Sequence, residues 1–310
     1  MSIEGLNFDK NFIESFIKNP ERLIMIKINS PFWKLALKNY SVVIGSIIFF
    51  SLVLSAIIGP NLTSYDAYKM NIRDRLKPPV FMEGGAWDHP LGTDALGRDL
   101  LARVLSGMRV SLIIGFSTVI IIFFLGSTLG MIAGYNGGII DTIQMRITDT
   151  QLSLPLIVLA IAILGVTRPN IYSIIIVLAL SSWPIYARVT RGIVLGEREK
   201  EYVRAAKIIG ASGARIIMRY IAPGILPSVA LVAVLDIARM IIFEAILGFL
   251  GLSIQPPQPS FGNIIADGRK YLINAWWIAT MPGVVLSVLL ISINMIGSGF
   301  ERVRKTIIET

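Results

Sequence analysis

Long apolar runs separated by shorter polar segments dominate the 310-residue chain. A membrane-spanning helix needs about 20 mainly apolar residues, and six segments meet that requirement. The third is the least regular, because Asp141, Arg146 and Asp149 fall in its first three turns. The pattern predicts an all-α membrane protein with six transmembrane helices, over residues 41–59, 110–134, 139–166, 171–187, 228–252 and 278–300.

The polar segments between these runs predict how the chain is divided. The first transmembrane helix, residues 41–59, is expected to end at Pro60, because proline lacks the backbone N–H that a helix interior needs. We expect four further parts: an N-terminal tail over residues 1–40, a loop over 60–108, a five-helix core over 109–300 that includes a polar loop at 196–227, and a C-terminal tail over 301–310.

The distribution of lysine and arginine predicts the orientation in the membrane. With the N-terminus inside the cell, the segments 1–40, 188–219 and 301–310 are cytoplasmic and carry six, eight and three basic residues. The loop 60–108 is then external and balances six basic residues against six acidic ones. Because cytoplasmic loops carry an excess of lysine and arginine, we expect a multi-pass protein of the cell membrane with both termini in the cytoplasm.

Composition narrows the classes of function. Hydrophobic residues make up 54% of the chain and charged residues 16%, against about 25% charged in soluble domains. The absence of cysteine excludes disulfides and thiolate metal sites, and the single histidine, His89, leaves little imidazole chemistry. The N-terminal stretch lacks the features of a cleaved signal peptide. The net charge of +9 is explained by basic cytoplasmic loops and attraction to anionic lipid headgroups, without nucleic acid.

One cytoplasmic stretch, residues 201–227, is too charged to cross a bilayer and more regular than a linker. It predicts a short helix that Gly210 ends or bends and a second helix that Ser212 can cap. Pro223 and Pro227 are expected to break the second helix before the fifth span. The first helix would either offer small residues to a partner or lie on the membrane as an interfacial amphipathic helix. Its predicted apolar stripe consists of Ala205, Ala206, Ile208 and Ile209.

The small residues and prolines of this stretch resemble a loop in permease subunits of binding-protein-dependent ABC importers. In that family the loop forms a coupling helix that docks in a groove of a cytoplasmic ATPase. Ala205, Ala206, Gly210 and Pro227 match the family motif position by position, whereas Arg204 stands where the family has glutamate. The resemblance implies contact with an ATPase through Arg204, Ala205, Ala206, Lys207, Gly210, Ala211 and Pro227.

Two further motifs resemble the C-type permeases of dipeptide and oligopeptide importers. Residues 89–112 read HPLGTDALGRDLLARVLSGMRVSL and are similar to the segment before the second helix of those subunits. Residues 244–272 read EAILGFLGLSIQPPQPSFGNIIADGRKYL and are similar to the end of their fifth helix and the external loop that follows. The resemblance covers residues 30–305 and implies a type I ABC importer permease core with an extra N-terminal helix.

The external motif GTDALGRD has two interpretations. Thr93 or Asp94 can cap the helix that leads into the second span. Alternatively, Asp94, Arg98 and Asp99 contact an extracellular substrate-binding protein through charge-paired hydrogen bonds. A phosphate-binding loop is excluded because the Gly-Lys-Ser/Thr ending is missing. Later in the chain, Trp276 and Trp277 are predicted to anchor the last helix at the membrane interface.

The fifth span contains three ionisable residues, Asp236, Arg239 and Glu244. A lone charge in the middle of a membrane helix costs about 2.5–3.5 kcal/mol. Asp236 and Arg239 are three positions apart and can pair, whereas Glu244 is rotated away from Arg239. We expect the three residues either to border a translocation path or to form a structural ion pair with a neighbouring helix.

Three classes of function are compatible with parts of this pattern. The resemblance implies a permease subunit with no catalytic, metal or cofactor site, paired with a second B-type permease, two ATPase subunits that hold ATP and Mg, and an extracellular binding protein. The chain itself has no Walker A sequence. An ion-coupled secondary transporter would use Asp236 and Glu244 as coupling groups. An intramembrane enzyme is disfavoured, because positions eight residues apart lie about 80° apart around a helix and two turns apart along it.

Overall fold

The computed structural model describes residues 31–62, 66–167 and 169–309, and their regular structure is almost entirely helical. The predicted N-terminal tail therefore lies outside the described residues as far as position 30. The elements are α3 (Pro31–Lys38), α4 (Tyr40–Leu62), η1 (Ile72–Asp74), α5 (Leu100–Asn136), α6 (Gly138–Leu152), α7 (Leu156–Leu164), α8 (Ile171–Glu197), α9 (Glu201–Ile208), α10 (Gly213–Ile216), η2 (Ile217–Ile221), α11 (Ala222–Phe249), α12 (Phe261–Gly268), η3 (Arg269–Tyr271) and α13 (Trp277–Glu309).

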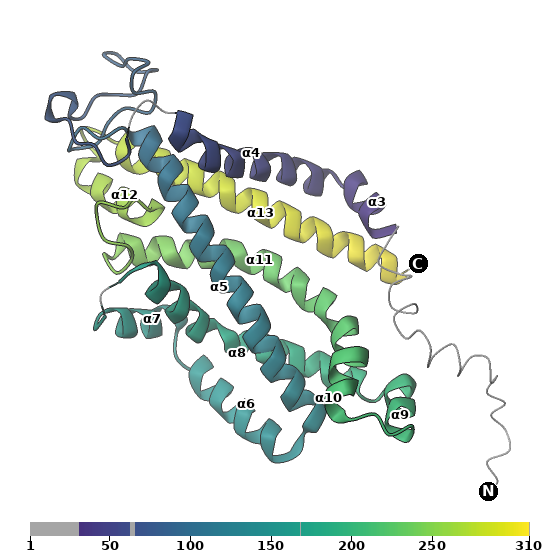
Figure 1. The fold of residues 1–310 in the computed structure, drawn as a ribbon. Helices are drawn as coiled ribbons and strands as arrows, with labels where there is room; N and C mark the ends of the chain where they lie inside the picture. The colour runs from purple at the N-terminus through teal and green to yellow at the C-terminus, as the bar shows by residue number, and fades with distance from the viewer. Residues whose placement is uncertain (1–30, 63–65, 168, 310) are drawn as a thin grey trace, which may run out of the picture.

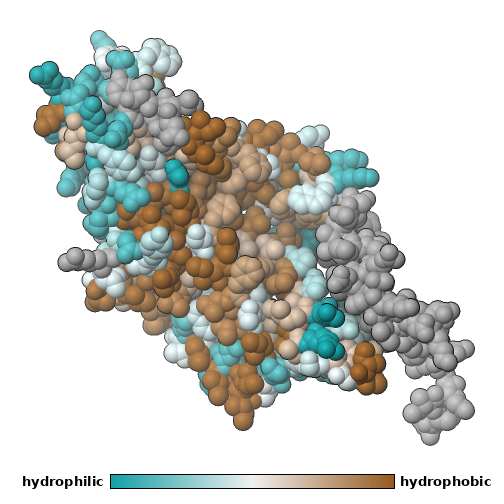
Figure 2. Space-filling view, viewed as in Figure 1, coloured by the Kyte–Doolittle hydropathy of each residue, from teal (hydrophilic) through white to brown (hydrophobic). Residues whose placement is uncertain are grey.

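The long helices form an elongated bundle with functional segments at its two ends. In Figure 1, α4 runs beside α13, and α5 crosses the bundle diagonally against α8. The segment 66–99 and α12 lie at one end of the bundle, and α9 and α10 lie at the other. Figure 2 shows hydrophobic residues over the middle of this face and hydrophilic residues gathered toward its ends. This is the distribution that a membrane-spanning bundle requires.

Five described helices are long and apolar enough to cross a membrane, and a bent pair can supply a sixth span. The pair consists of α6 and α7, which meet at an angle of 82°. The prediction of one continuous third span over 139–166 is therefore wrong. Pro155 lies directly before α7, and the residue before a proline is disfavoured in helical conformation. The polar helix α6 and the apolar helix α7 consequently run in different directions.

Several helices extend beyond the apolar runs that predicted them. The first span continues through Pro60 to Leu62, so the expectation that Pro60 closes it is wrong. The second helix begins at Leu100, ten residues before the predicted span, and the sixth continues to Glu309. Hydropathy locates only the part of a helix inside lipid, whereas polar turns continue outside it.

Close glycine contacts fix the pairing of α5 with α8. Gly126, Gly130 and Gly134 recur every fourth residue along α5. A Cβ atom at these positions would lie 2.5, 2.5 and 2.9 Å from atoms of α8. Small residues at this spacing let two membrane helices approach closely and gain van der Waals contact. The pair α5–α8 is thus one of the closely packed helix pairs of the bundle.

A second glycine contact seats α12 inside the bundle. A Cβ atom at Gly262 would lie 2.3 Å from the carbonyl oxygen of Ala245, and one at Gly248 would lie 2.9 Å from the Cα atom of Gly262. Phe261 at the start of α12 is fully buried among side chains of α5 and α13. The loop after the fifth span is therefore an integral part of the core at that end of the bundle.

Candidate functional site

The loop between α8 and α11 folds locally as its sequence predicts at Gly210 and Ser212. α9 (Glu201–Ile208) is followed by Gly210 in the left-handed region, with φ of +79°. Glycine adopts this conformation without a steric penalty, so it ends the helix. The hydroxyl of Ser212 then accepts a hydrogen bond from the backbone N–H of Arg215 at 3.4 Å and caps α10. The predicted helix–turn–helix arrangement is confirmed.

The prediction that prolines separate the second helix from the fifth span is wrong. From Gly213 the chain continues through α10 and the π-helical turn η2 into α11 without leaving helical structure, as far as Phe249. Pro223 lies two positions after the π-helical turn η2, whose i→i+5 bonding differs from that of the α-helix that follows. Pro227 lies inside α11. The loop and the fifth span therefore form one continuous helical element.

The apolar face of α9 also differs from the predicted stripe. Val203 and Ala206 are buried against the chain's own core, at 0% and 1% exposure. Ile208 and Ile209 face outward, at 85% and 62% exposure, and Ala205 is exposed as well. Residues three apart share a helix face, whereas adjacent ones are turned by about 100°. Ala206 therefore anchors α9, while Ile208 and Ile209 form its free apolar surface.

Two charged residues of α9, Arg204 and Lys207, have partners within the chain. Arg204 donates a hydrogen bond to Glu199 at 3.2 Å, and Lys207 lies 5.3 Å from the centre of the Tyr135 ring. Hydrogen bonding by Arg204 holds the pKa of the Glu199 carboxyl below its ordinary value. Arg204, where the family has glutamate, thus contacts the segment that connects α8 to α9. Of the other predicted coupling residues, Gly210 and Pro227 are exposed and Ala211 is half-buried.

In the fifth span, the pairing of Asp236 with Arg239 is confirmed. The two side chains form an ion pair at 3.1 Å, with the Asp236 side chain 9% exposed and that of Arg239 38% exposed. Glu244 is fully buried instead and accepts hydrogen bonds from Ser111 at 2.6 Å and Ser253 at 2.9 Å. Glu244 therefore joins α5, α11 and the following loop, and it takes no part in the pair of Asp236 with Arg239.

At the opposite end of the bundle, the cap of α5 is Asp99. Its carboxylate accepts a hydrogen bond from the N–H of Ala102 at 2.7 Å and contacts His89 at 2.8 Å. The prediction that Thr93 or Asp94 caps this helix is wrong, because Asp94 instead accepts hydrogen bonds from the N–H groups of the turn at residues 96 and 98. The helix starts only after that turn has been completed.

Models of two known families match the chain. The model of the binding-protein-dependent transport system inner membrane component matches residues 126–303. The model of the N-terminal transmembrane domain of oligopeptide transport permease C matches residues 30–79. The chain belongs to the binding-protein-dependent permease family. The resemblance drawn from the three sequence motifs is confirmed, and so are the type I permease fold and the extra N-terminal helix.

Named relatives of the permease cover most of its length. The di/tripeptide transport system permease DppC of Pseudomonas aeruginosa is 35% identical over 87% of this chain and 89% of its own. The dipeptide permease DppC of Alkalihalophilus pseudofirmus is 38% identical over 85% of each chain, and that of Bacillus subtilis is 32% identical over 96% and 90%. The chain is thus a multi-pass membrane subunit of an importer of this family.

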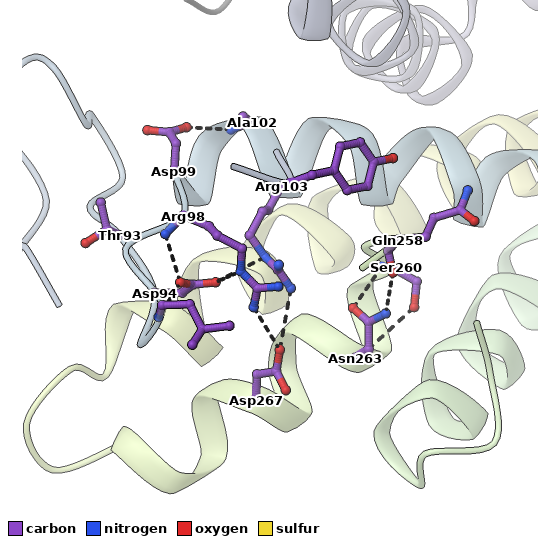
Figure 3. Close-up of polar contacts among 12 residues, drawn as sticks. Thr93, Asp94, Arg98, Asp99, Ala102, Arg103, Gln258, Ser260, Asn263 and Asp267 are labelled. Carbon is purple, nitrogen blue, oxygen red and sulfur yellow. Dashed lines mark hydrogen bonds and ion pairs between the residues drawn. The ribbon is translucent and has the colours of Figure 1, made fainter. Parts of the chain in front are cut away.

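The permease keeps a cluster of charges beside the α5 cap that the sequence did not reveal. Figure 3 shows Arg98 and Arg103 converging on Asp94 and Asp267. Arg98 donates to Asp94 at 2.6 Å, and Arg103 lies 3.5 Å from both carboxylates. Asp94, Arg98 and Asp99 are only 3–5% exposed. These contacts give the motif GTDALGRD its structural role, and they turn the Asp94 and Asp99 carboxylates toward the chain's own groups.

Trp277 connects two parts of the permease that lie far apart in the sequence. It is 4% exposed, and its indole N–H donates to the carbonyl oxygen of Thr93 at 3.2 Å. The Thr93 hydroxyl accepts a hydrogen bond from the N–H of Lys77 at 2.8 Å. The prediction of an interfacial anchor is therefore wrong for Trp277, which ties α13 to the segment 66–99. No local pattern could have signalled a partner so distant in the chain.

Proposed function

We propose that this permease is one of two membrane subunits of an ATP-driven importer of short peptides. The relatives in Pseudomonas, Alkalihalophilus and Bacillus carry names of dipeptide or di/tripeptide transport systems. The complete importer would contain a second, B-type permease, two ATPase subunits that hold ATP and Mg, and an external solute-binding protein. ATP hydrolysis would then occur on the partner subunits, and this chain would supply half of the translocation path.

The outward face of α9 is the observation that carries this proposal. Ile208 and Ile209 are exposed in a segment otherwise rich in charge, and exposed apolar side chains rimmed by polar residues mark interaction surfaces. Val203 and Ala206 hold the helix from behind. A rigid helix with a free apolar tip suits docking in a groove of an ATPase subunit.

The position of α9 also supports the proposed orientation. In Figure 1, α9 lies toward the same end of the bundle as α3 and the last turns of α13. If α9 meets ATPases in the cytoplasm, residues 31–38 and the C-terminal residues lie there too. The segment 66–99 and α12 then lie on the external side, where a solute-binding protein would deliver the peptide.

One face of α11 supports a translocation path between two permeases. The side chain of Arg239 is 38% exposed, and those of Ile242, Ile246 and Phe249 are 38%, 36% and 37% exposed. Their spacing of three, four and three positions places them on one side of a helix. An arginine within such a face is expected to border a water-filled path rather than lipid. Asp236 would hold that arginine in place.

The test of coupling compares three outward-facing positions. Ile208→Asp and Ile209→Asp remove the apolar tip of α9, whereas Met218→Asp, at 69% exposure in η2, introduces the same charge beside it. We expect the first two variants to lose co-purification of the ATPase subunits and ATP-dependent dipeptide uptake. The Met218 variant should retain both. If all three variants bind the ATPase subunits and transport dipeptide normally, α9 does not couple the permease to the ATPase subunits.

A further inference from the structure

A small cavity opens beside the charge cluster at the end of the bundle remote from α9. Its volume is about 170 Å³, below the roughly 300–1,000 Å³ typical of small-molecule sites. It therefore has room for part of a side chain rather than for a whole peptide. We call it the Arg98 pocket; it is lined by Asp94, Ala95, Leu96, Arg98, Asp267, Lys270, Tyr271 and Ile278.

Arg98 brings unused hydrogen-bond donors to this pocket. Its Nε donates to Asp94 at 2.6 Å, but the nearest contact of its terminal nitrogens is Asp267 at 3.5 Å. Charge-assisted hydrogen bonds are usually 2.7–2.9 Å long, so this contact is loose. The Asp267 side chain is also half exposed, at 50%. Part of the guanidinium of Arg98 is thus available to another acceptor.

The residues around the pocket have an excess of positive charge. Arg103 lies beside Arg98, is 2% exposed, and its Nε and Nη1 atoms have no hydrogen-bond partner among the described residues. Lys270 lines the pocket, is exposed, and forms no ion pair within the described part of the chain. Among the described residues, Arg98 and Arg103 form ion pairs with two carboxylates, Asp94 and Asp267, and Lys270 adds a third cation to the same pocket. One further carboxylate would balance the cluster.

We propose that the Arg98 pocket receives the carboxylate of an aspartate or glutamate side chain on the external solute-binding protein. The inference rests on the proposed function and identifies a contact through which that protein is held. The surroundings of the pocket suit a protein surface, since Leu96, Leu272 and Ile273 are 41%, 50% and 96% exposed. The entering carboxylate would pair with Arg98 and Lys270, while Asp94 continues to position Arg98.

The experiment measures binding of the solute-binding protein to the complete importer in lipid nanodiscs. Lys270→Gln and Lys270→Glu remove and reverse the exposed charge of the pocket without disturbing a buried contact. Arg73→Gln removes another exposed cation from the segment 66–99 that does not line the pocket. We expect Lys270→Gln to raise the dissociation constant about 3-fold to 10-fold and Lys270→Glu to raise it further, because close charge pairs contribute to affinity. Arg73→Gln should change it less than about twofold.

A second measurement separates a protein carboxylate from the carboxylate of the peptide. Binding-protein titrations are run with and without bound dialanine, and uptake is measured over a range of dialanine concentrations. If Lys270→Glu weakens binding of the solute-binding protein equally with and without dialanine, the proposal is supported. A change confined to the peptide-loaded form, or unchanged affinity in Lys270→Glu, overturns it. A wild-type importer that binds no solute-binding protein overturns the proposed function as well, so the two failures are distinguishable.

Discussion

The indole of Trp277 and the carbonyl oxygen of Thr93 are joined by a hydrogen bond of 3.2 Å across 184 positions of the chain. Trp277→Phe should retain most of the buried ring and lose this bond. Because Thr93 would keep a buried, unpaired carbonyl, we expect a loss of about 1–3 kcal/mol in the free energy of unfolding. Thermal unfolding in detergent measures the change. Trp276→Phe serves as the control, and equal effects of both substitutions would contradict the role given to the bond.

Gly210 and Gly196 form a matched pair for testing the turn after α9. A Cβ atom at either position meets no atom within 4 Å, but only Gly210 has positive φ, at +79°. Gly210→Ala should therefore cost about 1–2 kcal/mol, since a side chain is strained in the left-handed region. Gly196→Ala lies inside α8 and should be neutral or stabilising by up to about 1 kcal/mol.

The functional consequence of the Gly210 substitution separates the turn from general stability. We expect Gly210→Ala to lower ATP-dependent uptake and the yield of ATPase subunits bound to the purified permease, because α9 would be reoriented. Gly196→Ala should leave both unchanged. Similar uptake by the two variants at equal protein levels would show that the direction of α9 does not depend on the left-handed glycine.

The crossing of α11 and α12 depends on the absence of a side chain at Gly262. A methyl group there would lie 2.3 Å from the carbonyl oxygen of Ala245, so Gly262→Ala must displace α12. We expect a loss of about 1–3 kcal/mol, typical of overpacking in a close-packed core. Gly283→Ala in α13, where nothing lies within 4 Å, is the control. Thermal unfolding of the two variants checks the difference, and unaltered stability of Gly262→Ala would contradict the observed crossing.

The contact between Arg204 and Glu199 should depend on pH in a defined direction. The folded-state pKa of Glu199 is lowered from 4.5, chiefly by its hydrogen bond with Arg204. The contact therefore contributes to the stability of the folded state above pH 4.5. It is lost as the pH falls through the lower folded-state value. Arg204→Gln should raise the pKa toward 4.5, and Arg198→Gln should raise it less. Carboxyl ¹³C titration of labelled glutamate, assigned with Glu199→Gln, measures the midpoints.

Much of the helical framework could be predicted from the sequence, because the membrane demands long apolar runs whose backbone bonds are satisfied internally. Gly210 and Ser212 were also predictable, since each acts on its immediate neighbours. The break between α6 and α7 does not follow from the hydropathy pattern, although Pro155 precedes α7. The polar residues of α6 can be read from the sequence, but the direction of α6 depends on ion pairs with other helices. One such pair joins Asp141 to Arg191 of α8.

The partners of polar side chains were the least predictable part of the candidate sites. The pair Asp236–Arg239 follows from helix spacing, and it was correctly inferred. The hydrogen bond from Ser111 to Glu244 joins positions 133 residues apart, and no local pattern selects one serine among many. Asp94 and Asp99 are both suited to capping, and only the turn at Gly97, with φ of +71°, decides that Asp99 has that role.

The unbroken helical path from Gly213 to Phe249 has a mechanical consequence. A joint at Pro223 or Pro227 would let α9 move while the fifth span stayed still. Since the path has no break at either proline, a displacement at its α9 end would be carried through η2 toward the stretch that carries Arg239. The π-helical turn η2 is its least regular segment, because the wider i→i+5 bonding differs from the helix on either side. Bending of the rod would therefore be concentrated within this one turn.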